Sequence, residues 1–146
     1  PGAWIAAAFE EMLREQGDAA EVLAEASAMT DVTGFGLLGH VPTLCEASGV
    51  GAELDAQAVP LVNGALELAQ AGLRATLTDQ NRNVAPEYPI TPLSDLMFEP
   101  QTAGGLLAAV PASDAAVILE RLRGLGHRAA RIGQITSGSR VTLTGL

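Results

Sequence analysis

An apolar segment, a single carboxylate and a glycine-punctuated turn follow one another between Thr30 and His40, in the order Thr-Asp-Val-Thr-Gly-Phe-Gly-Leu-Leu-Gly-His. This order predicts an extended segment over about residues 28–32 and a helix over about residues 36–47. The first N–H groups of a helix lack intrahelical partners and can face an anion. Mg²⁺ binds through one or two carboxylates plus substrate phosphates, which suits Asp31. The stretch therefore predicts a nucleotide-phosphate site; the alternative is a tight turn in which Asp31 caps the helix.

A second stretch, residues 99–107, reads Glu-Pro-Gln-Thr-Ala-Gly-Gly-Leu-Leu and combines a loop, a hydroxyl group, two glycines and an apolar run. Thr102, Gly104 and Gly105 could present a hydroxyl and backbone N–H groups to an anion. The alternative is a junction between a loop and a strand, where small residues avoid a clash. Both interpretations fit these residues.

Together, in this order and at this separation, the two stretches resemble the C-terminal domain of selenophosphate synthetase (selenide, water dikinase). This family belongs to the superfamily related to aminoimidazole ribonucleotide synthetase. The family's first motif is matched throughout, whereas its second, Asp-Pro-Gln-Thr-Ser-Gly-Gly-Leu-Leu, is changed at Glu99 and Ala103. The resemblance extends over about residues 30–143.

The resemblance implies a function for the whole enzyme and a part of it for this chain. The full enzyme would convert ATP, selenide and water into selenophosphate, AMP and phosphate. An N-terminal ATP-binding domain would supply most nucleotide contacts, the reactive Cys or selenocysteine and most metal-binding Asp residues. The chain would supply Asp31 as a Mg²⁺ ligand and would be inactive alone. The resemblance also implies a homodimer of the full enzyme, and a phosphate-facing wall built from Thr33, Gly34, Gly36, Asn83, Thr102, Gly104 and Gly105.

The segment over residues 74–95 reads as a long loop, and a loop of this length inside a compact domain is more often functional than accidental. Asn81 and Asn83 both match an Asn that the family carries in this loop, and turn chemistry is the alternative for either. His40, alone on a helix, is expected to be a packing or capping residue, and His127 is expected to be exposed.

Composition narrows the function classes. The formal charge is −9 and every basic residue is Arg, so a nucleic-acid partner is not expected and a P-loop lysine is absent. No apolar run approaches the roughly 18 residues that span a bilayer, which predicts no membrane partner. The single cysteine, Cys45, excludes an internal disulfide, fits a cytoplasmic location and lies on the apolar face of the helix over residues 36–47.

The periodicity predicts an α+β fold with one mixed or antiparallel sheet, packed helices and α/β/α layers. The C-terminal part reads β-α-β-β, half of a ferredoxin-like unit. Residues 1–146 are expected to form a single domain, with a helical lead-in over residues 1–27 and a core over residues 28–146. Helices are expected at about 2–16, 18–26, 36–47, 60–71 and 113–124, and strands at about 28–32, 50–54, 105–110, 129–135 and 140–143.

Three alternatives to the synthetase remain open. Thiamine-phosphate kinase, the hydrogenase maturation factor and the purine enzymes share the superfamily's fold. The longer protein could instead be a fusion with a flavin-dependent domain, since residues 75–81 resemble such members. A third alternative is a catalytically idle binding or dimerisation module. The fact that position 1 is Pro suggests a piece of a longer chain.

Overall fold

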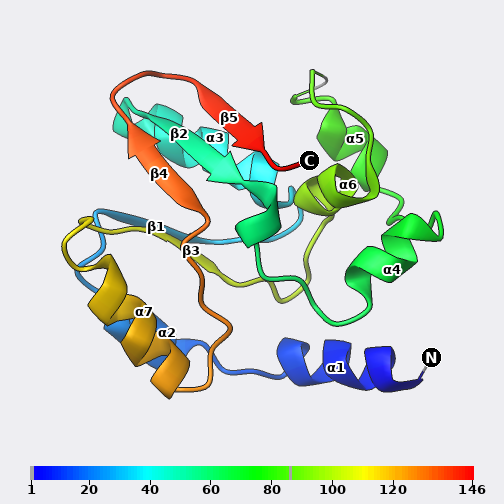
Figure 1. The fold of residues 1–146 in the computed structure, drawn as a ribbon, viewed down its shortest axis with the longest axis horizontal. Coiled ribbons are helices and arrows are strands. Elements are labelled where there is room, and N and C mark those ends of the chain that lie inside the picture. The colour runs from blue at the N-terminus through cyan, green and yellow to red at the C-terminus, as the bar shows by residue number, and fades with distance from the viewer. Residues whose placement is uncertain (1, 86) are drawn as a thin grey trace.

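Two small β-sheets framed by short helices organise the chain (Figure 1). The computed structural model describes residues 2–85 and 87–146. The strands are β1 (Ala28–Asp31), β2 (Gly51–Asp55), β3 (Leu106–Ala109), β4 (Gly133–Thr136) and β5 (Val141–Thr144). The helices are α1 (Gly2–Met12), α2 (Gly17–Val22), α3 (Leu37–Ser48), the 3₁₀ turn η1 (Ala56–Ala58), α4 (Ala65–Gln70), α5 (Thr78–Arg82), α6 (Pro92–Phe98) and α7 (Ala115–Gly124). The predicted α+β class is confirmed.

The strands divide between the two sheets instead of forming the single sheet expected. β1 and β3 pair antiparallel, with Ala28 opposite Ala109 and Asp31 opposite Leu106. The second sheet has the order β4-β2-β5, in which β2 is antiparallel to β4 and parallel to β5. The C-terminal order β-α-β-β is confirmed, but β2 lies between β4 and β5. The turn over residues 136–139 therefore does not close a hairpin.

Helix α3 supplies the centre of the main core. Leu37, Leu38, Val41 and Cys45 recur at helical spacing and are buried against β2, β5 and α6. Gly49 ends the helix with a φ of +66°, which glycine adopts without steric cost. Burial raises the pKa of the Cys45 thiol, so Cys45 is the small buried hydrophobe that its position predicted.

A second apolar cluster lies between α2 and α7 and consists of Ala19, Leu23 and Leu122. Leu106 and Ala108 of β3 pack against it, while Leu107 of the same strand packs against the main core. Helices thus cover both faces of the β1–β3 pair, which gives the expected α/β/α layering there (Figure 1). Val117 of α7 lies outside this cluster and is 59% exposed.

The region over residues 74–95 is more ordered than its sequence suggested. It contains α5 and most of α6, so the expectation of a continuous loop is wrong there, and Pro86 lies outside the described residues. Pro92 is at the start of α6, and Thr91 forms a capping box with Ser94. A proline at this position leaves no intrahelical bond unmade. Conversely, the helix expected over residues 60–71 is shortened to α4, which begins after Gly64.

His127 pairs with Asp18 across the α2–α7 contact. Its side chain is only 13% exposed, and its Nε2 lies 2.9 Å from Asp18 Oδ1, so the expectation that it is exposed is wrong. The hydrogen bond from His127 lowers the pKa of Asp18.

The division into a lead-in over residues 1–27 and a core over residues 28–146 stays a prediction, and Pro1 lies outside the described residues. In the parts that are described, none of the helices has the length and apolar character needed to cross a membrane.

Candidate functional site

The first motif forms the end of β1 and the turn that leads into α3. Asp31 is the last residue of β1 and is exposed. Gly36 occupies the N-cap position of α3 with a φ of +70°, and no described side chain caps this helix. Asp31 therefore does not cap α3, and the capping alternative for this residue is wrong. Its carboxylate remains available for another role.

His40 stabilises the turn from inside α3. Its Nε2 accepts a hydrogen bond from the N–H of Thr33 at 3.0 Å and lies 3.2 Å from Thr33 Oγ1. A backbone N–H can only donate, so Nε2 is the acceptor in the contact with the Thr33 N–H. The ring also lies 5.9 Å from that of Phe35. The prediction of a packing or capping His40 is confirmed.

The second motif runs directly beside the first. Gln101 donates its N–H to the carbonyl oxygen of Thr33 at 3.1 Å, and Val32 donates to that of Gly105 at 3.0 Å. The bond between Val32 and Gly105 continues the register of the β1–β3 ladder past Asp31, and the bond between Gln101 and Thr33 joins the loops beyond it. The two motif loops, residues 32–36 and 99–105, are thus brought together by the pairing of β1 with β3.

The four glycines of the two motif loops differ in how much space surrounds them. A β-carbon on Gly36 would lie 2.7 Å from the carbonyl carbon of Phe98, and one on Gly104 would collide with the carbonyl oxygen of Val32. Gly34 and Gly105 have open space at the same position. Close backbone approach therefore explains why positions 36 and 104 require glycine. It does not explain the glycines at positions 34 and 105.

Several N–H groups of the two motif loops are not used internally. Those of Gly34 and Phe35, and those of residues 102–105, are paired with no acceptor among residues 2–85 and 87–146. By contrast, the N–H groups of Thr33 and Gly36 are both bonded. Unpaired N–H groups on adjacent loops can donate to the oxygens of one anion.

Helix α5 contributes a residue that the site prediction had left aside. Asn81 is buried, and its Nδ2 donates to the carbonyl oxygens of Gly34 and Phe98, each at 2.9 Å. Asn83, which was placed in the site, is exposed at the C-cap of the same helix. Thr102 is also exposed and lies in the second motif loop. One indication for Asn81 was present in the sequence: like Asn83, it matches the Asn that the family carries in this loop.

A buried charge network holds α5 in place. The Arg82 guanidinium donates to Ser94 Oγ and to the carbonyl oxygens of Tyr88 and Pro89, and it lies 4.8 Å from the centre of the Phe98 ring. Arg82 Nη1 is 3.2 Å from Asp95 Oδ1, an ion-pair distance without the geometry of a hydrogen bond. The sequence alone did not indicate this network.

The described residues supply few ligands for a cation. In residues 2–85 and 87–146, no three His, Cys, Asp or Glu side chains gather as a metal-binding group. Asp31 therefore offers one carboxylate, which suits Mg²⁺ only where phosphates or other carboxylates complete its coordination.

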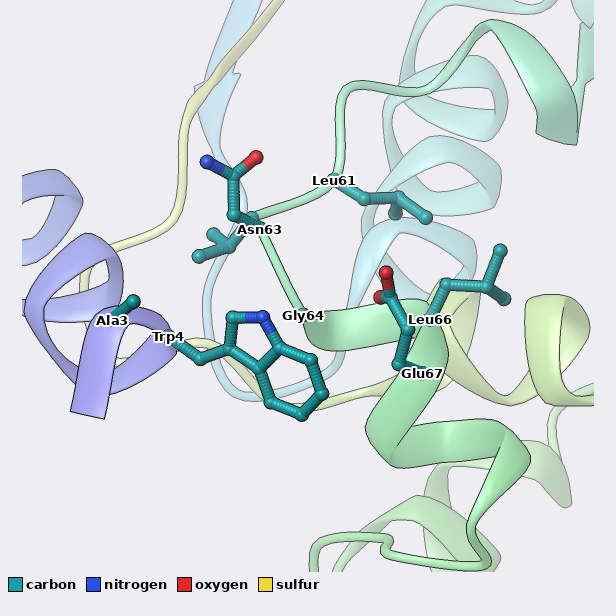
Figure 2. A pocket seen from close by; sticks show the side chains of 8 residues that line it. Ala3, Trp4, Leu61, Asn63, Gly64, Leu66 and Glu67 are labelled. Carbon is teal, nitrogen blue, oxygen red and sulfur yellow. The ribbon is translucent and has the colours of Figure 1, made fainter. Parts of the chain in front are cut away.

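A hollow of about 520 Å³ lies apart from the motif loops, between α1 and α4. Figure 2 shows the indole of Trp4 lying against Gly64 at the start of α4, with Asn63 and Glu67 around it. None of the motif residues lines this hollow. The motif loops are thus separate from this depression.

Among known sequences, the chain is similar to proteins named selenide, water dikinase. It is 42% identical to the selenide, water dikinase of Treponema denticola over 101 residues, which cover 66% of this chain and 28% of that protein. It is 40% identical to the enzyme of the same name from Caldanaerobacter subterraneus over 122 residues, which cover 79% of this chain and 36% of that protein. The chain thus spans about a third of the length of these curated relatives.

Solved structures with the same fold are more distant in sequence. The hydrogenase maturation protein HypE of E. coli gives a TM-score of 0.62 at 20% identity, covering 92% of this chain and 38% of that one. The thiamine-monophosphate kinase of Stenotrophomonas maltophilia gives 0.59 at 20% identity, covering 84% and 32%. Residues 5–145 match the family described as AIR synthase related protein, C-terminal domain. The chain therefore belongs to this family of C-terminal domains.

Proposed function

We propose that this chain is the C-terminal domain of a selenophosphate synthetase, which uses ATP, selenide and water to form selenophosphate, AMP and phosphate. The observation that carries the proposal is its 40–42% identity to proteins named selenide, water dikinase. The complete match of residues 30–40 to that family's motif supports it further. The fold alone does not favour this activity over the kinases that share it.

In this proposal the two motif loops form one wall of the phosphate site. The unpaired N–H groups of Gly34 and Phe35, and those of residues 102–105, donate to phosphate oxygens. Asp31 contributes one carboxylate to Mg²⁺, which would neutralise phosphate charge when bound. Such positioning and charge stabilisation are the main means by which proteins accelerate phosphoryl transfer.

The rest of the site is proposed to come from the N-terminal ATP-binding domain of the full enzyme. Helix α1 supports this, because it has no buried residue and exposes Ile5 (61%), Phe9 (58%) and Met12 (48%). An apolar helix face of this kind is typical of an interface. We further propose a homodimer of the full enzyme and a cytoplasmic location, which the unpaired thiol of Cys45 fits.

The isolated chain is proposed to be inactive and to bind ATP weakly. One exposed carboxylate cannot hold Mg²⁺ tightly, since this ion keeps most of its water. The charge of −9 also opposes a polyanion. We therefore expect an ATP dissociation constant in the millimolar range, which corresponds to a binding free energy of roughly −4 kcal/mol.

The proposal is tested in the full-length protein with ATP, Mg²⁺ and selenide, by following AMP release and selenophosphate with ³¹P NMR. Parallel reactions replace selenide with thiamine monophosphate, which tests the kinase that shares the fold. Selenide-dependent AMP formation by the full-length protein, but not by residues 1–146 alone, is the expected result. Phosphorylation of thiamine monophosphate, or no turnover with either substrate, would overturn the proposal.

A further inference from the structure

Asn81 is the side chain that joins the turn after β1 to the end of α6. It is 9% exposed, and both hydrogen bonds of its Nδ2 group reach carbonyl oxygens, one of Gly34 and one of Phe98. Gly34 belongs to the first motif loop, and Phe98 immediately precedes the second. The two N–H groups of one carboxamide therefore bridge segments 64 residues apart in the sequence.

No other common side chain of this size can make both bonds. A carboxylate has no N–H to donate, and a serine hydroxyl donates only one hydrogen bond. The two segments also touch directly, since a β-carbon on Gly36 would press on the backbone of Phe98. Asn81 thus fixes the distance between the turn at Gly34 and the end of α6, at a point where the two backbones are already in contact.

The helix that carries Asn81 is itself tied to the second motif loop. Thr78, which is fully buried, donates its hydroxyl to Glu99 Oε2 at 2.8 Å. On the same helix, Arg82 is anchored to the carbonyl oxygens of Tyr88 and Pro89. Helix α5 is therefore fixed in position, although it is only five residues long.

We infer that Asn81 is a positioning residue for the phosphate site: it holds the turn at Gly34 against the second motif loop. The unpaired N–H groups of Gly34 and Phe35 then face the same anion as those of residues 102–105. This inference rests on the proposed function for its catalytic consequence. Its structural part, the alignment of the two loops, can be tested separately.

The first test measures amide hydrogen exchange in residues 1–146. Asn81→Asp removes both donors and sets a carboxylate against two carbonyl oxygens. The N–H of Gln101 donates the hydrogen bond to Thr33 that spans the two loops. Its proton should then exchange with solvent at least about tenfold faster, while the amide protons of β2 and β4 stay protected. The matched control Gln80→Glu makes the same chemical change on the exposed side of α5 and should leave Gln101 unchanged.

Asn81→Ser, which keeps one donor, covers the event that Asn81→Asp does not fold. In Asn81→Ser the amide exchange rates should rise by an intermediate amount, and only in the two loops. A uniform rise across β2 and β4 in Asn81→Ser would show that Asn81 only supports the fold and would overturn the inference. Unchanged exchange at Gln101 in either folded variant would do the same.

The second test uses the full-length protein. In Asn81→Ser the KM for ATP should rise at least about fivefold, because phosphate-binding N–H groups are misaligned. A fall in kcat with unchanged KM would indicate only fewer folded molecules and would contradict positioning. If the wild-type protein has no selenide-dependent activity, the proposed function fails, whereas hydrogen exchange still decides whether Asn81 aligns the loops.

Discussion

Gly36 passes so close to Phe98 that a β-carbon on the glycine would lie 2.7 Å from the carbonyl carbon of Phe98. The left-handed φ of +70° at Gly36 adds a second restriction, because L-residues rarely adopt it. The turn that presents Asp31 is thus determined by contact with α6 as well as by its own sequence. This relationship makes the motif glycines testable one by one.

Gly36→Ala should destabilise the chain by about 2–4 kcal/mol, the sum of left-handed strain and overpacking against Phe98. Gly34→Ala is the matched control, since a β-carbon there meets open space. It should change the free energy of unfolding by less than about 1 kcal/mol. Urea unfolding of both variants decides the point, and equal losses would show that the contact with Phe98 is unimportant.

A second glycine pair tests the approach of the two motif loops. Gly104→Ala should cost about 1–3 kcal/mol, because its β-carbon collides with the carbonyl oxygen of Val32. Gly105→Ala has open space and should be close to neutral. Thermal unfolding followed by circular dichroism measures both. A larger loss for Gly105→Ala than for Gly104→Ala would mean that the loops are arranged differently.

Cys45 should be unreactive in the folded chain. It is 3% exposed, and burial raises the pKa of its thiol above the ordinary value of 9.0. The thiolate is the reactive form, so modification by a disulfide reagent at pH 8 should require unfolding. The test is the rate at which the reagent releases its own thiol on reaction with Cys45, measured with and without denaturant. Rapid reaction of the native chain would contradict the buried position of Cys45 on α3.

The contact between Asp18 and His127 predicts a pH-dependent contribution to stability. The hydrogen bond from His127 lowers the pKa of Asp18 below the ordinary value of 3.8. The stabilising contribution is therefore present above about pH 4. It is lost as the pH falls below 3.8 toward the folded-state pKa. The difference in Tm between the wild type and Asp18→Asn should narrow over that range; a difference independent of pH would contradict the pairing.

The parts of the fold that depend on local sequence were predictable. The periodic apolar residues of α3, the αL position of Gly49 and the strand that ends in Asp31 all follow from patterns within a few residues. The division into two sheets was not predictable, because it depends on which strands pair over long distances. The placement of β2 between β4 and β5 is of this kind.

For the candidate site, sequence reasoning identified both motif loops but not what holds them together. The pairing of β1 with β3 places Asp31 opposite Leu106 and brings the two motif loops together. Asn81 lies inside the five-residue helix α5 and Asn83 is its C-cap residue. Choosing between them required the direction of each side chain, which periodicity cannot resolve. The ion pair of Arg82 with Asp95 connects residues within a region that read as a loop.

The role of Asp31 tests the central claim most directly. In the full-length protein, Asp31→Asn keeps the size and exposure of the side chain but removes the charge that would bind Mg²⁺. Because Asp31 does not cap α3, unfolding of the variant should match that of the wild type. Asp114→Asn, the same change at the exposed N-cap position of α7, is the control. The decisive measurement is the rate of selenide-dependent AMP release. The account predicts a loss of at least about a hundredfold for Asp31→Asn and none for the control; wild-type activity in Asp31→Asn would contradict it.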